Sequence, residues 1–421
     1  MRKLKITALL LSFVILALSL SSCSYGYNSD EYMTREEVEA LLQKSMIGNI
    51  SVEGGDTYEI TIQGEGSNVT AASKGLLSAV SVTANFEMSY SSSFGPQYSS
   101  TVREFSAVGS GVIYSLDKER GDAYIITNYH VVYDSRANTA NHISDDIYVE
   151  LYGKEAGGYE INAEFVGGSM YYDLAVLKVT GSRIIAESNA APVELADSSE
   201  VAVLDTAIAI GNPESGGLSV TVGHVNVDSE YITIEGADGT TSISLRVMRI
   251  DTAVNHGNSG GGLFDAQGRL IGIVNAKMSD SEVENIGYAI PSNLVKYVAD
   301  NILYYCDGTE VESVQRCLIG ITVGADDYYT EYDIESGRVY KRESVVIATV
   351  SEGGAADGLL KVGDSVRSVT VDGVEYVCDR MHVAVECMLN ARVGSEVVFH
   401  ITRDGVDMDV TVELDDNTTA W

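Results

Sequence analysis

Short runs of β-branched and other apolar residues recur along the chain from about residue 76. Glycine, aspartate, asparagine or serine bounds each run, as is typical of the strands of a β-sandwich or barrel. No strand–helix–strand alternation is visible, which excludes the folds that carry a serine on a strand-to-helix elbow. The runs are VSVTANF, AVGSGVIYS, AYIITNYHVV, DIYVELYG, LAVLKVTG, VAVLDTAIAIG, LSVTVGHVNV, SISLRVMRI and LIGIVNA.

A helix and a second group of strands follow this β region. PSNLVKYVADNIL (291–303) predicts a helix that begins with proline and closes the first domain. A second, smaller β unit runs from LIGITV (318–323) to MDVTVEL (408–414), with one helix near DRMHVAVECML. We therefore predict an all-β chain with domains at 76–303 and 317–415, joined by a linker at 304–316.

The first residues have the layout of an export signal. A cationic start, MRKLK, precedes the apolar run ITALLLSFVILALSL, which is short for a membrane span. The ending LSSC resembles the lipobox of bacterial lipoproteins, in which the cysteine carries the lipid; an ordinary cleaved signal or an uncleaved anchor is the alternative. We expect a signal peptide over 1–22, lipidation at Cys23, and a tether over 23–75 that contains a short amphipathic helix in MTREEVEALLQKSM.

Charge and cysteine content narrow the possible partners. The chain has 61 acidic and 27 basic residues, a formal charge of −34, which argues against nucleic acid as a partner. Four cysteines follow the leader, and an exported chain permits disulfides among them. We prefer pairing between sequence neighbours, although three connectivities are open. No CxxC or histidine-rich spacing supports a metal site, and no cofactor is expected. These cysteines are Cys306, Cys317, Cys378 and Cys387.

In the stretch NHGNSGGGLFDAQG (255–268), four glycines lie within three residues of Ser259. A tight turn needs only one or two glycines, each for a positive φ or a close approach of the backbone. Four of them suggest a backbone that leaves the hydroxyl uncovered and directs N–H groups at a ligand. The alternative is a glycine-rich hairpin without chemistry.

A serine nucleophile requires a base and an acid that orients the base. His130, in YIITNYHVV, lies at the end of a predicted strand, where flanking apolar residues would fix it. Asp173, in YYDLAVLKV, directly precedes another strand. A structural histidine and a turn-capping aspartate are the alternatives. The order His130, Asp173, Ser259 is the chain order of the chymotrypsin-type triad.

Seven segments together resemble the HtrA (Deg) family of serine proteases in their order and rough spacing. The resemblance covers about 76–303 and continues through 318–414, which is similar to the PDZ domain that follows the protease in that family. The segments are AVGSGVIY, TNYHVV, YYDLAVLKV, AIAIGNP, LSVTVGHV, GNSGGGLFDAQGRLIGIVNA and NIGYAIPSNLV.

The resemblance implies a chymotrypsin-like double β-barrel with the active site in the cleft between the barrels. Ser259 would attack the scissile carbonyl, His130 would take its proton, and Asp173 would hold the imidazole. The N–H groups of Gly257 and Ser259 would form the oxyanion hole.

The resemblance also implies where substrate binds. Ala253 and Val254 would form the base of the S1 pocket, and because neither is charged, we expect small or medium apolar side chains there. A substrate strand would pair with Val274, Asn275 and Ala276. In the second domain, four residues fall where PDZ domains bind a peptide carboxylate, although a plain β-turn without a ligand is the alternative. These are Leu318, Ile319, Gly320 and Ile321.

The chain departs from the family pattern NPGNSGGPL at two positions. His256 removes a rigid proline before the oxyanion loop, and Gly262 is expected to loosen the strand after the nucleophile. The leading hypothesis is an exported, lipid-anchored endopeptidase acting on unfolded polypeptides, with the PDZ domain binding peptide C-termini and trimers as the family suggests. The alternative is a peptide-binding or holdase-type protein with a latent protease fold.

Overall fold

The structure is a computed structural model that describes residues 49–53, 59–63, 68–94, 97–154, 159–213, 216–276, 286–306, 310–311, 313–334, 336–416 and 418–420. The predicted signal peptide, Cys23 and the helix predicted within 33–46 lie outside these residues. The chain divides into a unit that ends at Thr70 and a unit that begins at Ala71. In the first unit, β1 (Asn49–Glu53) pairs antiparallel with β2 (Glu59–Gln63). Within the described residues, no helix has the length and apolar character to cross a membrane.

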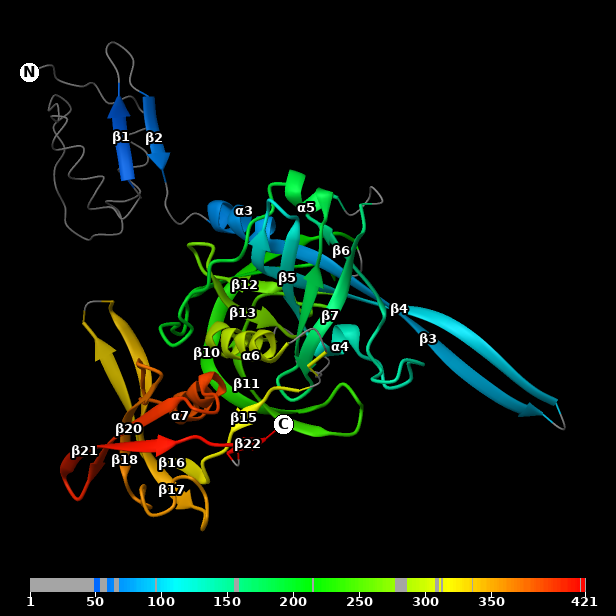
Figure 1. The fold of residues 1–421 in the computed structure, drawn as a ribbon. Coiled ribbons are helices and arrows are strands. Elements are labelled where there is room, and N and C mark those ends of the chain that lie inside the picture. Colours follow the sequence, from blue (N-terminus) through cyan, green and yellow to red (C-terminus); the bar gives the residue numbers. More distant parts are fainter. Residues whose placement is uncertain are drawn as a thin grey trace, which may run out of the picture. The chain divides into compact units, whose positions relative to one another are not determined.

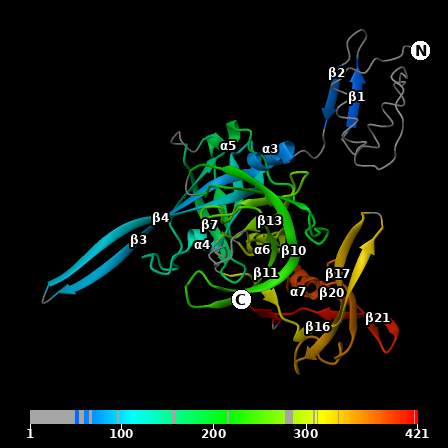
Figure 2. The ribbon, with the colours of Figure 1, turned by 180° about the vertical axis from the view of Figure 1, so that it is seen from behind.

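The first barrel of the larger unit is a closed antiparallel sheet in the order β3-β4-β5-β8-β7-β6. Burial alternates along its strands, as in DIYVEL of β6, where every second residue is buried. Figures 1 and 2 show that the β3–β4 hairpin extends well beyond the barrel. The strands are β3 (Ala79–Phe94), β4 (Gln97–Asp117), β5 (Asp122–Thr127), β6 (Asp146–Leu151), β7 (Ile161–Ser169) and β8 (Leu174–Val179).

The second barrel is also closed, in the order β10-β11-β14-β13-β12-β9. Helix α6 (Ser292–Tyr305) follows β14 directly, with Pro291 at its N-cap, as the sequence predicts. The predicted all-β architecture with two barrels is thereby confirmed. The strands are β9 (Thr206–Gly211), β10 (Ser219–Glu235), β11 (Ser242–Ile250), β12 (Gly262–Phe264), β13 (Leu270–Val274) and β14 (Gly287–Pro291).

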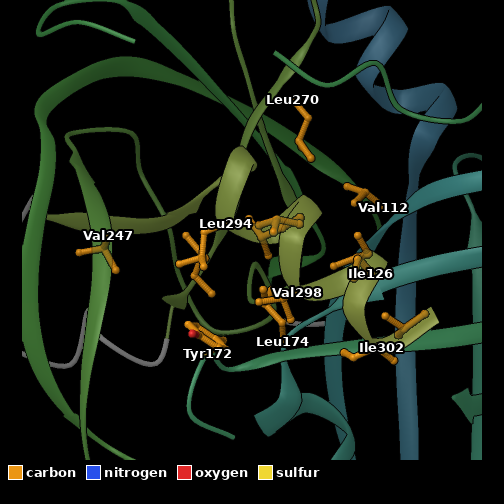
Figure 3. Close-up of a cluster of buried hydrophobic side chains, with 14 of the residues drawn as sticks. Val112, Ile126, Tyr172, Leu174, Val247, Leu270, Leu294, Val298 and Ile302 are labelled. Atoms are coloured by element: carbon orange, nitrogen blue, oxygen red, sulfur yellow. The ribbon is translucent and has the colours of Figure 1, made fainter. Parts of the chain in front are cut away.

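One hydrophobic cluster joins the two barrels and α6 (Figure 3). Leu294, Val298 and Ile302 of α6 are four residues apart and form one apolar face of the helix. Because both barrels pack against the same side chains, their relative position is set by the core, and with it the position of residues at their junction. The first barrel contributes Val112, Ile126 and Leu174, and the second contributes Val247, Leu270 and Ile273.

The C-terminal part is a separate antiparallel sheet in the order β16-β17-β18-β20-β21, with β19 paired to β18. It has its own buried core, and the helix predicted near DRMHVAVECML is present as α7 (Met381–Glu386) followed by the 3₁₀ helix η3 (Cys387–Asn390). A short pair, β15 (Arg316–Cys317) with β22 (Thr419–Ala420), lies at its ends. The other strands are β16 (Ile321–Asp333), β17 (Arg338–Val350), β18 (Ser365–Val371), β19 (Val374–Val377), β20 (Glu396–Arg403) and β21 (Val406–Glu413).

A buried ion pair connects this sheet to the second barrel. Arg246 of β11 donates from Nε to Oε1 of Glu386 on α7 (2.5 Å) and from Nη2 to Oε2 (2.6 Å). Both side chains are almost fully buried. Burial, reinforced by the charges of Arg246 and Arg380, lowers the pKa of the neighbouring His382 to about 2. His382 is therefore neutral at working pH, and Arg246 has the glutamate as its bidentate counter-charge.

Three helices escape prediction from the sequence: α3 (Asn68–Ser78), α4 (Tyr129–Val132) and α5 (Arg183–Glu187). The buried positions of α3 are Ala71, Gly75 and Ser78, and such small residues give little apolar periodicity. The domain start predicted at residue 76 falls inside α3. A Cβ on Gly75 would lie 2.6 Å from Cδ1 of Ile210, so this helix packs closely on the second barrel.

The predicted disulfides are wrong, because all four C-terminal cysteines are free thiols. Cys378 and Cys387 are buried in the core of the C-terminal sheet. Their Sγ atoms each lie 3.5 Å from a backbone carbonyl oxygen, of Tyr376 and Ala384 respectively. The prediction relied on closeness in the sequence, whereas these cysteines serve as small apolar residues of the core.

Chemical modification can test the free thiols. Burial raises the pKa of Cys378 to about 12 and holds that of Cys387 well above its usual value, so neither is a thiolate near neutral pH. We expect both to resist iodoacetamide in the folded protein at pH 8. All four C-terminal cysteines should react once the protein is unfolded without reductant, as counted by mass spectrometry of the peptides. Unlabelled pairs after unfolding would contradict the structure.

Candidate active site

The side chain of His130 is held by Asp173. Helix α4 begins directly after β5, which places His130 in a short helical turn rather than at the predicted strand edge. Its Nδ1 lies 2.7 Å from Oδ2 of Asp173, and its backbone N–H donates to Oδ1 (3.0 Å). Both carboxylate oxygens thus orient one residue, which fixes the ring and leaves Nε2 for a further partner.

Asp173 adopts an unusual backbone conformation between β7 and β8. Its φ of +50° is in the left-handed region, which costs a non-glycine residue roughly 1–2 kcal/mol. The side-chain amide of Asn128 donates to the Asp173 carbonyl (2.8 Å), and the residue is only 5% exposed. The surroundings therefore hold the carboxylate in a place that the local chain disfavours, as is common at functional sites.

Ser259 belongs to the second barrel, in the loop before β12. Its carbonyl accepts from the N–H of Ser110 (2.8 Å), and the next N–H, of Gly260, donates to the carbonyl of Val274 (3.0 Å). Its Oγ accepts from the N–H of Ala276 (3.2 Å). Within the described part of the chain, no hydrogen bond joins this Oγ to His130. The Ser259 hydroxyl thus contacts the backbone of the second barrel and forms no hydrogen bond to the His130 ring among the described residues.

Two backbone N–H groups beside Ser259 are without acceptors. Among the described residues, no protein atom accepts from the N–H of Gly257 or of Ser259. Gly257 has φ +93° and its carbonyl accepts from Oγ of Ser110 (2.7 Å), which turns the loop. Gly260 has φ +83°, and a Cβ there would lie 2.1 Å from the carbonyl oxygen of Ser110. Glycine is required here, and the resulting loop can stabilise an oxyanion.

Asn275, which is expected to pair with a substrate strand, has a fully buried side chain. Its Nδ2 donates to Oδ2 of Asp173 (2.6 Å), the oxygen that also faces Nδ1 of His130. This bond joins β13's end to the loop before β8 and so crosses between the barrels. No local sequence pattern predicts this bond, because only the packing of the two barrels brings Asn275 and Asp173 together.

Val274 was also expected to pair with a substrate strand. Its N–H donates to the carbonyl of Gly261 (2.8 Å), and its own carbonyl accepts from Gly260. Both main-chain groups of Val274 therefore already have a partner within the barrel. The N–H of Ala276 is the group that contacts Ser259.

Replacement of Asn275 by alanine removes a charge-assisted hydrogen bond from a buried carboxylate. Such a bond is worth about 1.5–3 kcal/mol, so we expect kcat to fall roughly 10- to 100-fold with little change in KM. Steady-state kinetics on an unfolded protein substrate, with a pH profile, measure this. Asn275→Ser keeps a hydroxyl donor and should recover part of the loss. An unchanged kcat in Asn275→Ala would show that the bond does not position Asp173.

The two predicted S1 residues are both uncharged. Val254 is 8% exposed, and a Cβ on Gly287 would lie 2.7 Å from its Cγ2, so β14 packs directly against it. Ala253 is exposed, and its carbonyl accepts from Oγ1 of Thr221 (2.8 Å). Neither residue offers a charge to a basic substrate side chain.

Gly262, which is expected to loosen its strand, has a packing role in the structure. Gly262 pairs with Ile210 on one side and Ile273 on the other. A Cβ at this position would lie 2.5 Å from two ring carbons of Phe264. The space that a side chain would need is occupied by Phe264, so the glycine serves packing. His256 is exposed and adjoins the free N–H of Gly257.

The predicted carboxylate-binding loop precedes β16. Leu318 donates its N–H to the carbonyl of Thr418 (2.5 Å), so this N–H is not available to a ligand. The N–H groups of Ile319 and Gly320 have no acceptor among the described residues, while their carbonyls accept from Ala356 and Ser351. Gly320 has φ +81°, a left-handed conformation of the kind found where successive backbone N–H groups form an anion-binding nest.

In the described residues, no group of three or more His, Cys, Asp or Glu side chains has the arrangement to hold a metal ion. The junction of the barrels presents a hydroxyl, an imidazole–carboxylate pair and two backbone N–H groups.

Comparison with known proteins identifies similar chains. A trypsin-like peptidase domain matches residues 109–273. The chain is 31% identical over 342 residues to the serine protease Do-like HtrA of Bacillus subtilis (strain 168), covering 80% of this chain and 70% of that protein. It is 30% identical over 371 residues to the serine protease Do-like HtrA of Lactococcus lactis subsp. cremoris (strain MG1363), covering 84% of each.

Two further similarities bear on the fold and the cellular setting. The periplasmic serine endoprotease DegP of Escherichia coli (strain K12) is 30% identical over 319 residues, covering 74% of this chain and 58% of DegP. The solved structure of the HtrA-type protease AlgW with a tripeptide superposes with a TM-score of 0.50 at 26% identity, covering 83% of this chain and 97% of AlgW.

Proposed function

Since the chain belongs to the HtrA family of trypsin-like serine proteases and is a serine endopeptidase, we propose that it hydrolyses unfolded or damaged polypeptides with Ser259, His130 and Asp173. The observation that carries the proposal is the His130–Asp173 pair at 2.7 Å. The pair lies on the first barrel, while the second barrel presents Ser259, whose own N–H and that of Gly257 have no acceptor among the described residues.

In the proposed reaction, Ser259 Oγ attacks the substrate carbonyl while Nε2 of His130 accepts its proton. Asp173 stabilises the protonated ring, and the N–H groups of Gly257 and Ser259 bind the oxyanion. His130 then protonates the leaving amine. Because Oγ accepts from the N–H of Ala276 and has no hydrogen bond to His130 among the described residues, this mechanism requires Oγ and Nε2 of His130 to come within hydrogen-bond distance when substrate binds.

The remaining parts of the proposal concern targeting and recognition. The leader ending in Cys23 supports export and lipid anchoring outside the cytoplasm, and the relative DegP is named periplasmic. The unpaired N–H groups of Ile319 and Gly320 support capture of a peptide C-terminus by a PDZ-like domain. Trimer formation is proposed from the family resemblance.

Active-site labelling tests the proposal. The protein from residue 24 onward is incubated with a fluorophosphonate, with and without an unfolded protein, and adducts are mapped by mass spectrometry. We expect an adduct at Ser259, formed faster when substrate is present, because substrate binding would bring Oγ to His130.

Each outcome separates the hypotheses. An adduct at another serine would show that the nucleophile is misassigned. No adduct under either condition, with a folded protein, would support the alternative of a latent protease fold that only binds peptides.

A further inference from the structure

The strand β16 has an open edge. It is the end strand of the C-terminal sheet and pairs only with β17 among the described strands. Figures 1 and 2 show the β16–β17 hairpin extending past the other strands of the sheet. An edge strand presents alternate N–H and C=O groups that can pair with an added chain.

The position of this edge gives a bound peptide its direction. β16 begins at Ile321, directly after the loop in which Ile319 and Gly320 present unpaired N–H groups. A peptide whose C-terminal carboxylate lies at that loop can follow β16 only with its own chain running the opposite way. Residues farther from its C-terminus therefore lie farther along β16, toward Asp333, at about one ligand residue for each strand residue.

The distal half of β16 carries acidic and aromatic side chains. Asp326 and Asp327 are exposed, and neither forms an ion pair with a basic residue among those described. A register shift between Ala325 and Asp327 marks a bulge at this place. Beyond it, three tyrosines expose half or more of their surface: Tyr328, Tyr329 and Tyr332. Exposed carboxylates and tyrosine rings both attract guanidinium and ammonium groups.

The basic residues of the hairpin do not neutralise this surface, because acidic partners already engage them. Arg342 contacts Glu331 (2.8 Å) and Asp379 (2.5 Å). Arg338 pairs with Asp205 of the second barrel (2.7 Å). An acidic ligand would therefore meet the carboxylates of Asp326 and Asp327, which have no basic partner among the described residues, whereas a basic ligand would meet complementary charge.

The far end of the hairpin adjoins a cavity of about 780 Å³ that extends the same charge. Four acidic residues line it, and its two arginines are the paired Arg338 and Arg342. The cavity includes residues of both the C-terminal sheet and the second barrel, so a ligand that reaches it contacts both. The acidic lining residues are Glu200, Glu331, Asp333 and Asp379.

We propose that the open edge of β16 binds the upstream part of a C-terminal peptide, and that the preferred ligands carry lysine or arginine about five to eleven residues before their last residue. This rests on the proposed capture of a C-terminus by the loop before β16. It adds a length and a charge requirement that the loop alone does not impose.

Peptide binding to the full chain tests this inference. The Ser259→Ala variant prevents cleavage, and fluorescence anisotropy measures Kd for a tetrapeptide and two dodecapeptides with the same last four residues. One dodecapeptide has lysine and arginine in its first seven positions, and the other has glutamate there. We expect the basic dodecapeptide to bind about tenfold tighter than the tetrapeptide, and the acidic one no tighter.

Two double variants locate the effect. Asp326→Asn with Asp327→Asn should remove most of the advantage of the basic peptide and leave the tetrapeptide unchanged. Glu396→Gln with Glu413→Gln removes the same charge from an exposed pair on β20 and β21, and should change neither. Added salt should weaken only the basic dodecapeptide.

The results distinguish this inference from the function on which it rests. Equal affinity of the two dodecapeptides would overturn the proposed role of β16. The capture of a C-terminal carboxylate would still stand if amidation of the peptide C-terminus abolished binding. Tight binding of an amidated basic peptide supports the edge and contradicts capture of the C-terminus. Failure of every peptide to bind overturns both.

Discussion

Replacement of Ser259 by alanine is expected to lower kcat by about 10⁴- to 10⁶-fold, because it removes the only group placed to form the acyl bond in the proposed mechanism. The N–H groups of Gly257 and Ser259 belong to the backbone and are retained, so substrate binding should persist. We therefore expect fluorophosphonate labelling to disappear while the affinity for an unfolded substrate stays within about a factor of two to three.

Ser244→Ala is a matched control. Ser244 lies on β11 of the same barrel and is exposed, and its replacement should leave turnover unchanged. Stopped turnover in both variants would indicate a general folding defect, and a Ser259→Ala enzyme that still cleaves would remove Ser259 from the mechanism. Circular dichroism of both variants confirms that the barrels are folded.

Replacement of Arg246 by methionine should have the second largest effect. It leaves Glu386 buried without its bidentate partner, a loss that typically costs about 3–5 kcal/mol. Separation of α7 from β11 would let water reach the carboxylate, so this contact should open before the barrels unfold. Hydrogen exchange should then accelerate in Ser242–Ile250 and Met381–Glu386.

The same strand supplies a control for the ion pair. Arg249 contacts Glu230 at 3.3 Å, but both side chains are partly exposed, so Arg249→Met should change stability by less than about 1 kcal/mol. The double variant Arg246→Met with Glu386→Leu replaces both charges by apolar groups and should regain most of the loss. Equal exchange rates in Arg246→Met and the parent protein would contradict a structural role for the pair.

The strands and the long helix were predictable because their signals are local. Runs such as LAVLKV carry β propensity within six residues, and the proline before α6 sets that helix's start. Helix α4 is not predictable from the sequence, because four residues are too few to show a helical periodicity. The orientation of His130 in this helix depends on the carboxylate of Asp173, which is 43 residues away in the sequence. That contact is a product of the fold.

Residues at the candidate site differ in the same way. The glycines around Ser259 are recognisable in the sequence, because a tight turn needs fewer glycines than this loop contains. The bond from Asn275 to Asp173 and the packing of Phe264 on Gly262 cannot be recognised in this way. Both contacts depend on which strands become neighbours in the barrels. No regular sequence spacing of amide or phenyl side chains predicts such a contact.

The division of the site between the two barrels has a consequence for the newly made chain. His130 and Asp173 are both present once the first barrel has been synthesised. Ser259 and Asn275 belong to the second barrel and are synthesised later. In the proposed mechanism, neither barrel alone contains a nucleophile together with its base. A growing or truncated chain is therefore unable to cut proteins around it, and hydrolysis becomes possible only once the second barrel has closed against the first.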